Sequence, residues 1–144
     1  MALLNNECIH YEYLVPADDF TRAGAASSDI KKKLKTMAVS PDIIRKVAIA
    51  MYEGEINMVI HANGGTIYTD ICPDYIKMVL KDVGPGIPNI EQAMQEGFST
   101  ATADVHTLGF GAGMGLPNMK ANTDEMHIET ELGVGTTVTM VVNF

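Results

Sequence analysis

Three polar side chains interrupt an apolar segment of helical pattern that begins at Pro41. They are Glu53, Asn57 and His61, and they lie four residues apart. Each four-residue step rotates by only about 40° around an α-helix, so the three side chains form one stripe. Burying an amide without a partner costs about 1–3 kcal/mol, and burying an unpaired carboxylate costs more. The stripe is therefore either a self-satisfied structural feature or a site for a ligand.

A second candidate lies where a predicted strand ends at Asp82. This carboxylate continues the inward-facing register of the strand before it, which contains Ile76, Met78 and Leu80. The chain then continues as Val83-Gly84-Pro85-Gly86-Ile87. An inward carboxylate can accept hydrogen bonds from an exocyclic amine, and the two glycines let a ligand approach the backbone closely. The alternative is an Asx-type turn closed by glycine.

A third candidate is a segment in which every second residue is glycine. The glycines are Gly109, Gly111, Gly113 and Gly115, and a predicted helix follows them. Alternate glycines free backbone N–H groups to converge on an anion at a helix N-terminus, which holds phosphate without many cations. The spacing excludes both the P-loop and the dinucleotide-binding fingerprint. The alternative is a flexible hinge.

Length and charge limit the classes of protein to which these residues can belong. The 144 residues, 47% of them hydrophobic and 19% charged, predict one globular domain over residues 1–144. Ten Lys and Arg against 18 Asp and Glu give a net charge of −8, which argues against nucleic acid or an anionic membrane as a partner. The one cationic run, residues 31–35, is typical of the solvated face of a helix.

Cysteine usage and the N-terminus bear on the compartment. Cys8 and Cys72 are far apart in sequence and outside any metal-ligand spacing, so we expect free thiols in a reducing cytosol. The chain starts with no signal-peptide pattern and contains no apolar run of about 18 residues. These features predict a cytoplasmic location.

Turn residues divide the chain into short elements that position the three candidates. Segments that are β-rich or alternating, bounded by turn residues, predict strands over residues 9–15, 66–72, 75–83, 126–132 and 136–142. Helical spacing predicts a helix from a cap at Asp18 or Asp19 to Val39, then helices over 41–62 and 90–96, and one that begins near Met114. Adjacent strand pairs with few helices predict an α+β two-layer sandwich, in which helices cover one face of a largely antiparallel sheet.

Four motifs stand in one order along residues 41–142. They read Glu53-x-x-x-Asn57-x-x-x-His61, Asp82-x-Gly84-x-Gly86-Ile87, Gly111-x-Gly113-x-Gly115-Leu116 and Gly135-Thr136-Thr137. Together they resemble the N box, the two glycine boxes and the closing G-T-T of the GHKL superfamily, the ATP-binding domains of histidine kinases, type II topoisomerases, Hsp90, MutL and the anti-sigma-factor serine kinases. The segments 97–100 and 115–120 are most similar to the small bacterial switch kinases of the anti-sigma type.

The resemblance implies a Bergerat-type fold and specific roles for the motif residues. Asn57 would ligate Mg²⁺, Glu53 would act as the general base or position a water, and Asp82 would read the adenine amino group. The second glycine box would hold phosphates, residues 88–112 would form the ATP lid, and Thr137 would lie near adenine. The implied nucleotide-binding set is Asn57, His61, Asp82, Gly84, Gly86, Ile87, Gly109, Gly111, Gly113, Met114, Gly115, Leu116 and Thr137.

The predicted function is that of an ATP- and Mg²⁺-binding regulatory kinase. It would transfer the γ-phosphate to a Ser or Thr of a partner regulatory protein, which would be an anti-anti-sigma-like protein or a sigma factor. Two alternatives stay open: a nucleotide-dependent switch without catalysis, and a detached histidine-kinase catalytic domain. The lid has no Lys or Arg between Gly84 and Leu116, and its insertion-like stretch, residues 101–108, carries the one His of the lid, His106. The sequence leaves a homodimer open.

Overall fold

The computed structural model describes residues 7–17, 19, 21–95 and 115–144. Its strands form one antiparallel five-stranded sheet in the order β1-β2-β3-β5-β4. The strands are β1 (Ile9–Val15), β2 (Gly65–Ile71), β3 (Tyr75–Asp82), β4 (Glu125–Glu131) and β5 (Gly135–Asn143). The five predicted strands are confirmed to within one residue at each end.

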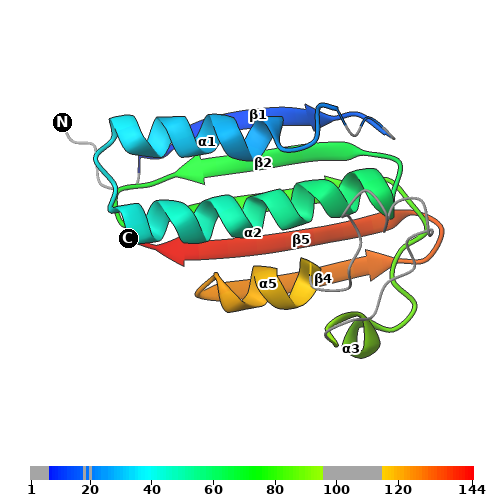
Figure 1. Ribbon diagram of the computed structural model, residues 1–144. Helices are drawn as coiled ribbons and strands as arrows, with labels where there is room; N and C mark the ends of the chain where they lie inside the picture. The colour runs from blue at the N-terminus through cyan, green and yellow to red at the C-terminus, as the bar shows by residue number, and fades with distance from the viewer. Residues whose placement is uncertain (1–6, 18, 20, 96–114) are drawn as a thin grey trace.

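The described helices are α1 (Ala25–Thr36), α2 (Pro41–Ile60), α3 (Ile90–Ala93) and α5 (Gly115–Ala121). Figure 1 shows α1, α2 and α5 against one face of the sheet, with the short α3 beyond the edge strand β4. The predicted α+β sandwich with helices on one face is confirmed. Among the described residues, no helix is both long and apolar enough to cross a membrane.

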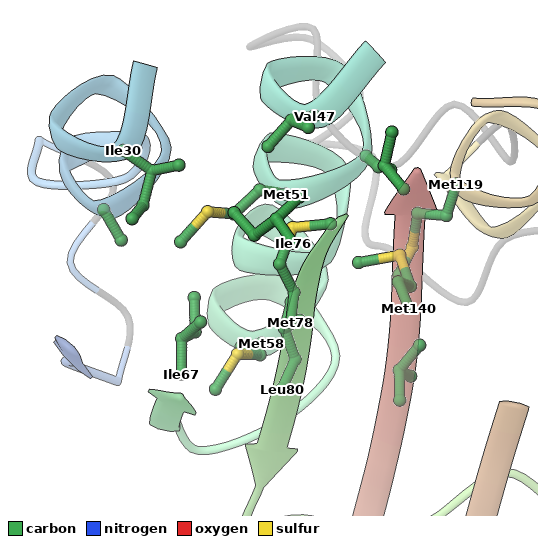
Figure 2. Close-up of a cluster of buried hydrophobic side chains, with 14 of the residues drawn as sticks. Ile30, Val47, Met51, Met58, Ile67, Ile76, Met78, Leu80, Met119 and Met140 are labelled. Carbon is green, nitrogen blue, oxygen red and sulfur yellow. The ribbon is translucent and has the colours of Figure 1, made fainter. Parts of the chain in front are cut away.

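The core fills the space between α2 and the inner face of the sheet (Figure 2). Its buried methionines include Met51, Met58, Met78, Met119 and Met140. Gly54 brings α2 against β3 directly, because a Cβ at this position would collide with the Leu80 side chain. The helix that carries the polar stripe is thus fixed against the strand that ends at Asp82.

Helix α2 begins and ends where local signals place it. The Ser40 hydroxyl accepts a hydrogen bond from the Ile43 N–H at 3.4 Å, and Pro41 occupies the first helical position. At the other end the His61 N–H donates to the Asn57 carbonyl at 2.9 Å, and Gly64 with a φ of 78° lets the chain turn into β2. The predicted cap and the predicted end near the Asn63-Gly64-Gly65 turn are confirmed.

Helix α1 begins later than the sequence predicts. It starts at Ala25, after Gly24 in the left-handed region with a φ of 94°, and no side chain adjacent in sequence caps it. In its first turn, the N–H groups of Ala26 and Ser27 donate instead to Glu55 of α2, each at 3.1 Å. The prediction of a cap at Asp18 or Asp19 is wrong for α1, because a carboxylate distant in sequence satisfies these donors.

The prediction of two free thiols is also wrong, because Cys8 and Cys72 form a disulfide. Antiparallel pairing of β1 with β2 sets Ile9 opposite Ile71, so the residues just outside this pair face each other, with 4.2 Å between their Cα atoms. Sequence spacing says nothing of this proximity, since 64 positions separate the two cysteines. The inference of a reducing compartment loses its basis.

Candidate functional site

Helix α5 packs on the polar stripe of α2 and supplies partners to it. A Cβ on Gly115 would lie 2.9 Å from Asn57 Nδ2, so any larger residue at the start of α5 would require the Asn57 amide to shift. One turn further along α5, Asn118 Nδ2 donates to Glu53 Oε2 at 3.2 Å. Met119 Sδ lies 4.0 Å from Asn57 Nδ2. Residues of the N box and of the second glycine box therefore meet, although about 60 residues of chain separate them.

All three stripe residues are half-buried, as expected for side chains at the boundary of a core. His61 lies at the C-terminal end of α2, about 12 Å along the helix axis from Glu53 at 1.5 Å per residue. Glu53 and Asn57 thus belong to the contact with α5, whereas His61 lies toward the loop that follows β3. The stripe therefore takes part in a structural contact, and none of its three residues is fully buried.

Asp82 lies at the end of β3 and faces the same side as the buried Leu80 two residues before it. Its Oδ1 accepts a hydrogen bond from the Thr136 N–H of β5 at 2.8 Å. Burial raises the pKa of this carboxyl above its ordinary value, and the Thr136 N–H opposes that effect. Among the described residues, no hydrogen-bond partner holds the second oxygen, Oδ2.

The loop after Asp82 runs between the end of α2 and the β4–β5 hairpin. The Gly84 backbone lies against Ala62, where a Cβ on the glycine would be 2.9 Å from the Ala62 Cβ. Gly86 has a φ of 81°, and a Cβ there would lie 2.8 Å from the Glu131 carbonyl oxygen, so both space and backbone conformation require glycine. The Ile87 N–H donates to the Thr130 hydroxyl at 2.8 Å.

Thr130 and Thr136 connect this loop to Asp82, and sequence reasoning assigned neither of them a role. Their hydroxyl oxygens are 3.0 Å apart, so Ile87 bonds to Thr130 and Thr130 to the hydroxyl of Thr136, whose separate backbone N–H bonds to Asp82. The inward register of Thr130 with Met126 and Ile128 was the available signal. A hydroxyl at a core-facing position needs a partner, and here the partner is the glycine loop.

Thr137 does not lie on the side of Asp82. It pairs across the ladder with Lys81 and Glu129, which are exposed, whereas Thr136 and Val138 on either side of it are buried. Successive side chains of a strand point to opposite faces, so Thr137 faces away from the helices and Thr136 faces toward them. The threonine of the closing motif that reaches Asp82 is therefore Thr136.

Several predicted site residues lie outside the described part of the chain. They are Gly109, Gly111, Gly113 and Met114, together with His106 and most of the proposed lid at 88–112. Residues 88–95 of that lid are described and include α3, which Asn89 caps through its bond from Gln92 N–H at 3.0 Å. Leu116 is half-buried against the core.

A cavity of about 220 Å³ lies between α3, α5 and β4. Its lining residues are Ile90, Met94, Lys120, Met126, His127 and Ile128. None of these residues belongs to the motifs, so this cavity is separate from the contacts of Glu53, Asn57 and Asp82.

Comparison with known proteins identifies the family. The family described as the histidine kinase-like ATPase domain matches residues 16–142. The chain is 32% identical over 97 residues to the serine/threonine-protein kinase RsbT of Bacillus subtilis (strain 168), covering 65% of this chain and 67% of the relative. It is 32% identical over 109 residues to the anti-sigma F factor of Clostridium beijerinckii (strain ATCC 51743 / NCIMB 8052), covering 72% and 73%.

A further anti-sigma F factor, from Caldanaerobacter subterraneus subsp. tengcongensis, is 33% identical over 102 residues, covering 67% of this chain and 68% of the relative. The family match extends from the residue after β1 almost to the end of β5 and so includes both the α2–α5 contact and the Asp82–Thr136 contact. The chain belongs to the family of histidine kinase-like ATPase domains.

Proposed function

We propose that this protein binds ATP with Mg²⁺ and transfers the γ-phosphate to a Ser or Thr of a partner regulatory protein. The observation that carries the proposal is the contact of α5 with α2. It sets the last glycine of the second glycine box against Asn57 and holds Glu53 one helical turn away. An amide oxygen, a carboxylate and closely approaching backbone are the groups needed at the phosphate end of a nucleotide site.

The residues at this contact fit a Mg²⁺ ion carried by a triphosphate. Mg²⁺ prefers hard oxygen ligands and keeps several waters, so one or two protein oxygens suffice. Asn57 offers its amide Oδ1 at a half-buried position, and Glu53 keeps a second carboxylate oxygen that Asn118 does not engage. When bound, the ion would neutralise phosphate charge at the α2–α5 contact.

Asp82 would select the base. With Oδ1 occupied by the Thr136 N–H, the other oxygen is the one available to accept from the adenine amino group. An ionised carboxylate only accepts hydrogen bonds, so the carbonyl that guanine has in place of that amine would find no donor. The hydrogen bonds from Ile87 to Thr130 and from Thr130 to Thr136 would hold the glycine loop in place beside the base.

Glu53 would accept the proton of the attacking Ser or Thr hydroxyl. As the hydroxyl oxygen bonds to the γ-phosphorus, its proton passes to the carboxylate, and the bond to the bridging oxygen breaks with its electrons leaving on ADP. Support for protein phosphorylation comes from the relative named serine/threonine-protein kinase, and support for a sigma-factor pathway from the relatives named anti-sigma F factor. The partner would thus be a regulatory protein of a sigma-factor pathway, either an anti-anti-sigma-like protein or a sigma factor.

One observation favours a second function, that of a switch which binds partners according to its nucleotide but transfers nothing. No Lys or Arg occurs between Gly84 and Leu116, and phosphoryl transfer gains strongly from a cation on the developing charge. In this case ATP would change affinity for the partner, and Glu53 would have no effect on the chemistry of the partner.

The test isolates the proteins that co-purify with this chain from its native host and incubates each purified partner with γ-labelled ATP and Mg²⁺. The proposal expects label on a Ser or Thr of one partner, and much less label with the Glu53→Ala variant. Partner binding that depends on ATP without any label transfer would support the switch and overturn the kinase. Absence of ATP binding by the folded wild type would overturn both.

A further inference from the structure

Helix α5 presents three successive contacts to α2 on one of its faces. Gly115, Asn118 and Met119 are spaced i, i+3 and i+4, the spacing that lines one side of a helix. Gly115 and Met119 lie against Asn57, and Asn118 reaches Glu53. The two α2 residues proposed to act on ATP are therefore each held by α5.

The bond from Asn118 to Glu53 is the one of these contacts that fixes an orientation. A glutamate carboxylate at a half-buried position has three side-chain torsions, and its terminal torsion is broad unless something holds it. Asn118 donates to Oε2 at 3.2 Å through an amide N–H₂ that has no ionisable proton. One oxygen of Glu53 is thus occupied, and the other keeps its accepting lone pairs in a defined direction.

The backbone that carries the Asn118 side chain is itself held in place. Asn122 Nδ2 donates to the main-chain carbonyl of Asn118 at 2.8 Å, and the adjacent Met119 is fully buried in the core. The donor therefore sits on a segment anchored by packing, which is what the support of a reacting group needs in order to define its position.

We propose that Asn118 is a positioning residue for Glu53, which rests on the proposed kinase function. It holds Oε2, so that Oε1 points toward the hydroxyl that is to be phosphorylated and accepts its proton. The oxygen–phosphorus bond forms as the bond from phosphorus to the bridging oxygen breaks, with the electron pair leaving on ADP. Asn118 takes no part in these bond changes and acts through Glu53 alone.

The test compares kcat for phosphorylation of the partner, and KM for ATP, among variants of residue 118. Asn118→Leu keeps the size and removes the donor, while Asn118→Asp keeps the size and replaces the donor by a second acceptor. Asn118→Leu should lower kcat roughly 10- to 100-fold with KM for ATP within about twofold of wild type, because a misplaced base loses rate rather than substrate binding. Asn118→Asp, which also adds a negative charge beside Glu53, should lower kcat at least as much. Asn118→Gln, which retains an amide donor, should recover part of the loss.

Two controls distinguish positioning from a general effect on the fold. Asn143→Ala removes an exposed amide at the end of β5 that pairs with Tyr75, far along the strand from Asp82, so its kcat should stay near that of wild type. In a Glu53→Gln background, Asn118→Leu should cause no further loss, because there is no carboxylate left to orient. Unfolding of each variant is followed by circular dichroism, and the Asp and Gln variants decide the question if the Leu variant does not fold.

Each outcome is decisive. Equal kcat for wild type and the Asn118 variants, or an Asn118→Leu loss of the same factor with and without the Glu53 carboxylate, overturns the positioning role and leaves the kinase intact. A wild-type protein that binds ATP and partner yet transfers no phosphate overturns the proposed function, and the positioning role falls with it.

Discussion

Replacing Asp82 by Asn should weaken ATP binding and leave the nucleotide-free fold at least as stable as before. The two oxygens of this carboxylate have different roles, one in the fold and one in the proposed contact with adenine. Oδ1 accepts from the Thr136 N–H at 2.8 Å, and an Asn at this position keeps such an acceptor. The other oxygen becomes an N–H₂ group, a donor where the adenine amine also presents a donor.

The magnitude follows from the single bond that is lost. A hydrogen bond to a charged group contributes about 1.5–3 kcal/mol, so the variant should bind ATP about 10- to 150-fold more weakly. GTP binding should change less, because the new N–H₂ group can donate to the guanine carbonyl. The preference of the wild type for ATP over GTP should therefore narrow in the variant.

Asp82→Asn should weaken ATP binding but should not destabilise the nucleotide-free protein. Burial holds the pKa of Asp82 above its ordinary value in the folded chain. Between the unfolded and the folded pKa, the folded protein binds more protons, so the free energy of unfolding falls as the pH rises through this interval. At pH 7 the ionised carboxylate thus lowers stability, and the neutral Asn variant should melt at the same or a higher temperature.

Calorimetric titration with ATP and with GTP, together with thermal unfolding without nucleotide, measures both effects. Asp74→Asn is the matched control, since Asp74 lies in the turn at the other end of β3 and is exposed. The reasoning is refuted if wild type binds GTP and ATP equally. It is also refuted if Asp82→Asn lowers the melting temperature and leaves ATP affinity unchanged, since Asp82 would then serve the Thr136 contact only.

Three further variants test the other parts of the site and the fold. Asn57→Ala should weaken ATP binding in Mg²⁺ more than in EDTA, and equal losses in a calorimetric titration contradict the ligand role. Glu53→Ala should bind ATP near wild-type affinity while partner phosphorylation falls about 10²- to 10⁴-fold, and a folded variant with wild-type rate removes Glu53 from the mechanism. Cys8→Ser opens a loop of 64 residues, which should cost about 4 kcal/mol in urea unfolding of the oxidised protein; an unchanged midpoint would show that the bond does not restrict the unfolded chain.

The fold was predictable because its elements carry local signals. Alternating patterns mark the strands, and Ser40-Pro41 marks the start of α2 through a capping hydroxyl and a residue with fixed φ. The polar stripe was likewise readable, since four-residue spacing in a helix places Glu53 and Asn57 on one side. These signals depend only on neighbours in sequence, so they can be recognised without knowing which distant segments come into contact.

What could not be predicted depends on contacts between distant segments. Glu55 accepts from the Ala26 and Ser27 N–H groups in the first turn of α1. It lies 28 to 29 residues away, and no sequence pattern near α1 indicates this contact. The Cys8–Cys72 bond follows from strand register, which spacing alone does not reveal. The choice between Thr136 and Thr137 depends on a shift of one residue, and the motif Gly-Thr-Thr offers a threonine in either register.

Glu55 has a consequence for the order in which the protein folds. Helix α1 has 12 residues, no acidic side chain in its first turn and no capping side chain adjacent in sequence. A helix of this length is marginal in water by itself. Its first turn gains two hydrogen bonds when α2 presents the Glu55 carboxylate, which is 2% exposed in the folded chain. The two helices should therefore form and open as one cooperative unit, with amide protons of α1 exchanging no more slowly than those of α2.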